Sequence, residues 1–118
     1  MEMIDVSPRL RNRLERIIKA LCAIVSSPNV EEYAVGITSD PTGRRSAYGT
    51  VDSEMSALVL LEWNLGRDDA LELEEALQGY ICFAHKNSPV FRKAVDRMHT
   101  SHRRSAHKDK PNYLYVVW

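Results

Sequence analysis

The densest set of residues able to do chemistry lies near the end of the chain. Residues 85 to 118 contain eight basic and two acidic residues, and they include all four histidines. Guanidinium and ammonium groups at this density are typical of a surface that binds a nucleic-acid phosphate backbone. A solvated helix face followed by a loop would show the same pattern, so both interpretations stay open. The candidate contacts are Arg92, Lys93, Arg97, Arg103 and Arg104.

The histidines of the same segment are possible ligands of a metal ion. His99, His102 and His107 have no cysteine or acidic partner at a spacing typical of zinc sites. We therefore expect no zinc site among them. The two cysteines, Cys22 and Cys82, are too few for a disulfide framework and suit small apolar residues in a reducing compartment.

The overall charge hides how the charges are distributed. The 16 basic and 16 acidic residues cancel, which taken alone argues against a basic nucleic-acid binder. Residues 1–27 hold five basic and three acidic residues, whereas residues 28–84 hold three basic and eleven acidic ones. The net charge of zero therefore comes from an acidic middle segment that balances two basic ends. Such segments could contact nucleic acid, or could pair with each other, with a protein partner or across a homodimer.

The elements that must position these residues follow from hydrophobic periodicity and from Ser-Pro and Asp-Pro helix starts. They predict a small three-stranded, mostly antiparallel sheet covered by helices, of class α+β, in a single domain over residues 1–118. Helices are expected from Pro8 to about Ser26, from Pro41 to Tyr48, after Asp68 and Asp69, and after Ser88; strands are expected over Tyr33–Thr38, Ser56–Trp63 (the candidate central strand) and Tyr113–Trp118.

Nothing in the pattern predicts a membrane protein. No apolar run approaches the roughly 20 residues that a membrane-spanning helix needs, and the first residues lack the pattern of a signal peptide. We therefore expect a cytoplasmic protein that does not associate with membranes.

One segment of the acidic middle resembles a known family. A strand-end glycine is followed by a threonine, an acidic residue before proline, an arginine eight residues after the glycine and an aromatic residue four further on. This resembles the second motif of GIY-YIG nucleases. A later run, Ala70-Leu-Glu-Leu-Glu-Glu-Ala-Leu77, is similar to the family's glutamate-bearing helix. The residues on the second motif are Gly36, Thr38, Asp40, Pro41, Arg44 and Tyr48.

The resemblance implies a site for phosphodiester hydrolysis. Arg44 would stabilise the charge that builds on the phosphoryl group, because its fork matches phosphate and its charge does not titrate. Glu74 would hold one Mg²⁺ or Mn²⁺ ion, which polarises the phosphate. Tyr48 would orient or activate the attacking water. These three roles come from the family and are expectations for this chain.

The family's first motif, a Gly-Ile-Tyr strand, has no counterpart before residue 33, where a basic helix is predicted. Ala34 also stands where the second motif has its tyrosine, and a one-residue slip places Tyr33 on the opposite face of a strand. The terminal run Asn112–Trp118 looks like the missing strand, displaced to the end of the chain. If it pairs beside residues 33–38, Tyr113 or Tyr115 would reach the site.

These features lead to two main hypotheses about function. The first is a metal-dependent nuclease that hydrolyses nucleic-acid phosphodiester bonds, with DNA favoured over RNA. The alternative is a catalytically inactive GIY-YIG-like module that binds nucleic acid or a protein partner. A weaker third hypothesis is a protein whose acidic middle mimics DNA.

Overall fold

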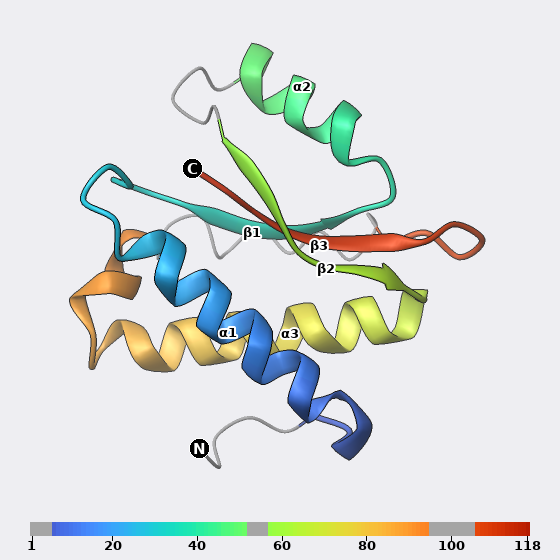
Figure 1. Cartoon of the computed structure of the whole chain (residues 1–118), viewed down its shortest axis with the longest axis horizontal. Coiled ribbons are helices and arrows are strands. Elements are labelled where there is room, and N and C mark those ends of the chain that lie inside the picture. Colours follow the sequence, from blue (N-terminus) through green and yellow to red (C-terminus); the bar gives the residue numbers. More distant parts are fainter. Residues whose placement is uncertain (1–5, 52–56, 95–105) are drawn as a thin grey trace.

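The computed structural model describes residues 6–51, 57–94 and 106–118, with the backbone alone at 48–51 and 94. Three helices and a three-stranded sheet alternate along the chain, with short 3₁₀ turns (η) at two places (Figure 1). In order they are η1 (Pro8–Leu10), α1 (Arg11–Val25), β1 (Ala34–Thr38), α2 (Pro41–Val51), β2 (Leu58–Leu65), α3 (Arg67–His85), η2 (Pro89–Ala94) and β3 (Asn112–Val117). The predicted α+β class with its three strands is confirmed.

The sheet places the last strand of the chain in its centre. The strand order is β1-β3-β2, and β3 is antiparallel to both neighbours. Our prediction that the Ser56–Trp63 segment is the central strand is wrong, because β3 inserts between β1 and β2. The burial agrees with this order: β3 has one half-buried residue and is otherwise buried, whereas β2 exposes Val59 and Trp63.

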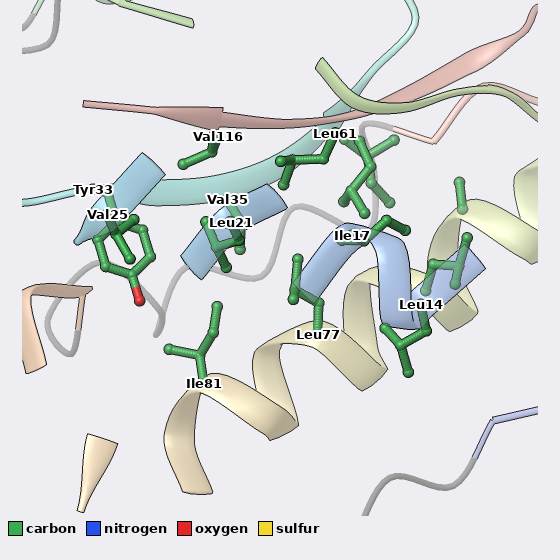
Figure 2. Close-up of a cluster of buried hydrophobic side chains, with 14 of the residues drawn as sticks. Leu14, Ile17, Leu21, Val25, Tyr33, Val35, Leu61, Leu77, Ile81 and Val116 are labelled. Atoms are coloured by element: carbon green, nitrogen blue, oxygen red, sulfur yellow. The ribbon is translucent and has the colours of Figure 1, made fainter. Parts of the chain in front are cut away.

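One face of the sheet, the core face, is covered by α1 and α3 (Figure 1). Alternate strand residues point to it, and they include Val35, Leu114 and Val116. Leu14, Ile17 and Leu21 of α1, like Leu77 and Ile81 of α3, point into the same cluster (Figure 2). Helix α1 forms because its apolar residues recur every three or four positions, which gives one continuous stripe for this contact.

The opposite face, here called the α2 face, carries the remaining strand side chains and lies beneath α2 (Figure 1). A small cluster of Ala34, Tyr115 and Val117 lies there, with Leu58 and Leu60 packed against it. The fourth helix expected after Ser88 is the 3₁₀ turn η2 in the part of the chain described. None of the described helices is long and apolar enough to cross a membrane.

The basic first helix and the acidic middle are joined by ion pairs. Arg9 forms two hydrogen bonds with the Asp69 carboxylate, of 2.9 and 2.5 Å. Glu62, 7% exposed on β2, accepts from Arg13 at 3.0 Å and lies 3.7 Å from Arg16. Part of the charge segregation seen in the sequence is therefore used to hold η1 against α3 and α1 against β2.

Candidate functional site

The turn between β1 and α2 positions Arg44. The Thr38 hydroxyl accepts a hydrogen bond from the Asp40 amide at 3.0 Å, and the Asp40 carboxylate accepts one from the Gly43 amide at 3.1 Å. This carboxylate caps the first turn of α2, as Asp commonly does before a proline. The Arg44 amide donates to the Asp40 carbonyl at 3.0 Å. Arg44 therefore starts from a fixed backbone, one turn into the helix.

Tyr115 of β3 reaches Arg44 across Gly36. Tyr115 and Gly36 are register partners in the β1–β3 ladder. A Cβ atom on Gly36 would lie 2.6 Å from the Tyr115 hydroxyl and 2.8 Å from the adjacent ring carbon. The Tyr115 ring therefore crosses directly over the glycine, which explains why a residue without a side chain is needed at position 36.

The contact between Arg44 and Tyr115 is both polar and aromatic. An Arg44 guanidinium nitrogen donates to the Tyr115 hydroxyl at 3.4 Å, a long hydrogen bond. The guanidinium carbon lies 5.9 Å from the centre of the Tyr115 ring, within the range of a cation–π contact. Tyr115 is fully buried, whereas Arg44 is half-buried. A buried aromatic ring therefore holds the guanidinium of a half-buried arginine.

The expectation that the terminal strand pairs beside residues 33–38 is confirmed by the β1–β3 ladder. Of the two candidate tyrosines, Tyr115 contacts Arg44. Tyr113 is paired with Thr38, two residues farther along the same face, and is half-buried. The side chain of Tyr48, the third candidate, lies outside the described residues.

Tyr33 does not take part in this site. It is fully buried, and its hydroxyl points between Val25 and Ile81 on the core side (Figure 2). That hydroxyl has no hydrogen-bond partner in the described structure. Burial in apolar surroundings raises the pKa of the Tyr33 phenol well above its ordinary value. The phenol therefore stays neutral, and it is separated by the sheet from Tyr115.

Glu74 belongs to the buried stripe of α3. It is 2% exposed and lies one helical turn from both Ala70 and Leu77, which face the core. Its position within the stripe differs from that of its exposed neighbour Glu75. Its role as a metal ligand stays a prediction.

The described residues do not fit a hydrated magnesium or manganese ion at Glu74. Magnesium usually keeps several waters in proteins and takes one or two carboxylates, so its ligand must face solvent. A carboxylate that is 2% exposed offers no such room. In the ranges 6–51, 57–94 and 106–118, no group of three His, Cys, Asp or Glu residues could hold a metal ion.

The predicted nucleic-acid contacts near the end of the chain separate into different environments. The Lys93 ammonium donates to the carbonyls of Val25, Ser27 and Val30, so it closes the end of α1 and the loop after it. Arg92 is exposed and donates to the His85 carbonyl at 3.4 Å. The other three predicted contacts, Arg97, Arg103 and Arg104, lie outside the described residues.

The exposure of Trp63 was not anticipated from the sequence, whereas Lys108 and Lys110 belong to the basic block that predicts phosphate-backbone binding. Trp63, flanked by Glu62 and Asn64 on β2, is 53% exposed. Lys108 and Lys110 are exposed in the turn just before β3. The apolar residues two positions away, Leu61 and Leu65, are buried, so the sequence pattern alone gives no signal that Trp63 is exposed.

The chain matches no protein-family model, no curated protein and no solved structure. The candidate site therefore has to be judged on its own geometry.

Proposed function

We propose that this chain is a GIY-YIG-like module that binds the phosphodiester backbone of nucleic acid at Arg44. The observation that carries the proposal is the Arg44–Tyr115 contact over Gly36. It joins the arginine of the second motif to an aromatic strand that comes from the end of the chain. DNA remains the first candidate ligand.

The geometry supports phosphate binding for a physical reason. A guanidinium offers a planar fork of donors that matches phosphate oxygens. Binding is stronger when the fork is already held in place, because less side-chain entropy is lost. Arg44 is half-buried, and its guanidinium is held against the buried Tyr115 ring. Arg45, the next residue, is exposed and adds a second positive charge.

The test is equilibrium binding of fluorescein-labelled DNA to the full chain in EDTA, followed by fluorescence anisotropy. We expect Arg44→Ala to weaken binding about tenfold or more, the loss of hydrogen bonds from a charged donor. Arg44→Lys keeps the charge without the fork and should recover only part of this loss. Arg11→Ala is the matched control, since Arg11 is an exposed arginine on α1, across the sheet from α2. Equal losses for Arg44→Ala and Arg11→Ala would overturn the proposal.

Hydrolysis is the second candidate function, and the Tyr115 hydroxyl beside Arg44 favours it. In GIY-YIG nucleases, tyrosines near the arginine help to orient or activate the attacking water. The experiment is incubation of plasmid and single-stranded DNA with the chain, with and without Mg²⁺ or Mn²⁺. A nuclease should lose cleavage in Arg44→Ala and Tyr115→Phe while each variant stays folded. Binding without cleavage by the parent chain under all these conditions would leave the binding module as the function.

A further inference from the structure

The α2 face does not end at Tyr115. Along β3 the next residue on this face is Tyr113, which is half-buried and paired with Thr38. On the other side of β3, the pairing passes from Glu62–Leu114 to Leu65–Asn112, so Trp63 and Asn64 lie opposite Tyr113. Tyr113 therefore stands between the Arg44–Tyr115 site and the β2 edge.

Trp63 shares a face with Tyr113 because of where Glu62 points. The Glu62 carboxylate reaches Arg13 and Arg16 of α1, so it lies on the core side of β2. Successive strand side chains point to opposite faces, which places Trp63 on the α2 face. Tyr113 and Trp63 therefore lie on the same face of neighbouring strands.

The backbone beneath Trp63 is held firmly while its ring is open to solvent. The Trp63 amide donates to the Glu62 carboxylate at 3.3 Å, and its carbonyl accepts from Arg13 at 3.3 Å. Asn64, the next residue, has a φ of 57°, in the left-handed region, and breaks the regular ladder there. With this support the indole is still 53% exposed. Tryptophan and tyrosine rings are enriched at interfaces, where one side is apolar and the other wet, so an indole exposed beside a tyrosine strand is a candidate binding contact.

Positive charge lies at both ends of this aromatic pair. Arg44 and Arg45 of α2 are on one side, and Lys108 and Lys110 precede Tyr113 on the other. Asp109 lies between the two lysines, and Asp40 is engaged in the cap of α2, so the balance of these groups is positive.

The turn that carries the lysines is itself ordered. The buried Asn112 side chain accepts from the His107 amide at 2.6 Å and donates to the His107 carbonyl at 2.8 Å. The His107 ring nitrogen Nδ1 accepts from the amides of Asp109 and Lys110 at 3.0 and 3.1 Å. Lys108 and Lys110 are therefore part of an ordered turn that immediately precedes β3.

We propose that Tyr113 and Trp63 form a stacking platform for unpaired bases, so that the ligand of the Arg44 site is single-stranded nucleic acid. The inference rests on the proposed function and names its ligand class. Phosphates are taken by Arg44 at one end and by Lys108 and Lys110 at the other. Bases stack on aromatic side chains without regard to sequence. In a duplex both faces of each base are covered by neighbouring base pairs, so the platform has nothing to stack against.

The experiment compares a labelled oligothymidylate with its duplex, bound to the full chain in EDTA. The single strand should bind about tenfold or more tightly than the duplex. Trp63→Ala should weaken single-strand binding about 5- to 100-fold, the range for loss of one stacked base. Tyr113→Ala should weaken single-strand binding by a similar factor. Trp63→Phe retains an aromatic ring and should keep most of the affinity, which would show that substitution at this position leaves the strand intact.

Phe83→Ala is the matched control, because Phe83 is 41% exposed but belongs to α3. It should leave binding unchanged. The platform is overturned, and the proposed phosphate binding at Arg44 retained, if both probes bind equally well, Trp63→Ala has no effect and Arg44→Ala weakens binding. Binding of neither probe overturns the proposed function and the platform together. A Trp63→Ala defect as large on the duplex as on the single strand overturns base stacking.

Discussion

The two faces of the sheet use the same central strand for different purposes. On the core face, β3 contributes Leu114 and Val116, which are fully buried against α1 and α3. On the α2 face it contributes Tyr113 and Tyr115, one half-buried and one holding Arg44. The alternation of a single strand therefore separates core residues from those of the proposed binding site. Changes that respect this separation should move one property, stability or binding, and leave the other.

The largest expected effect comes from the core face. Leu114→Ala removes a fully buried side chain from the centre of the sheet and should lower the free energy of unfolding by about 2–5 kcal/mol. Tyr113→Ala changes the adjacent residue on the other face and should cost under about 1 kcal/mol. Urea unfolding followed by circular dichroism measures both. Similar losses for the two variants would contradict the separation.

Gly36→Ala should affect both stability and DNA binding, because Gly36 of β1 lies directly beneath the Tyr115 ring of β3. Its new methyl group would overlap the Tyr115 ring, so we expect a loss of about 1–3 kcal/mol in stability and weaker DNA binding. Gly79→Ala is the matched control: Gly79 is exposed on α3, with nothing within 4 Å of an added Cβ. That variant should be neutral or more stable, by up to about 1 kcal/mol, from helix propensity. Equal outcomes for the two glycines would refute the close packing at Gly36.

Lys93 sharpens the comparison among basic residues. Lys93→Met removes an ammonium that donates to carbonyls at the end of α1 and should lower stability by about 1–2 kcal/mol. DNA binding, measured below the unfolding transition, should stay close to that of the parent. Arg92→Ala, an exposed neighbour, should change stability by less than about 0.5 kcal/mol. A binding defect in Lys93→Met without a loss of stability would restore Lys93 to the nucleic-acid surface.

The smallest effect is expected at the Arg9–Asp69 pair. The Arg9 hydrogen bond holds the pKa of the Asp69 carboxyl below its usual value of 3.8. A carboxyl whose pKa is lower in the folded state stabilises the fold above its unfolded pKa, and this contribution disappears as the pH falls through the folded value. Arg9→Ala should therefore differ slightly from the parent at neutral pH, and the two should converge as the pH falls through the lowered pKa of the folded Asp69 carboxyl. Thermal unfolding at several pH values tests this; a difference that grows in acid would have the wrong sign.

The local pattern around Arg44 could be predicted because each step depends on neighbouring residues. Asp40 and Pro41 specify the start of α2, and Gly36 marks the strand before it. The pairing of the terminal strand could also be anticipated from its aromatic, β-branched run. Its central position could not, because strand order depends on contacts between segments far apart in the chain.

The roles of individual charged residues were less accessible from sequence. Glu74 stands in a run with Glu72 and Glu75, and only the packing of α3 shows that it is the buried one. Lys93 looks like its basic neighbours, yet it caps carbonyls more than 60 positions earlier in the chain. Non-local hydrogen bonds of this kind leave no periodic signal in the sequence.

The central claim is that Arg44 and Tyr115 act as one unit in binding phosphodiester. A double-mutant cycle with Arg44→Ala, Tyr115→Phe and the double variant, read as binding of labelled single-stranded DNA in EDTA, tests it most directly. We predict that the two losses are not additive, with a coupling of about 0.5–3 kcal/mol, because the tyrosine hydroxyl acts by holding the guanidinium. Additive losses, or no loss from either change, would contradict the account.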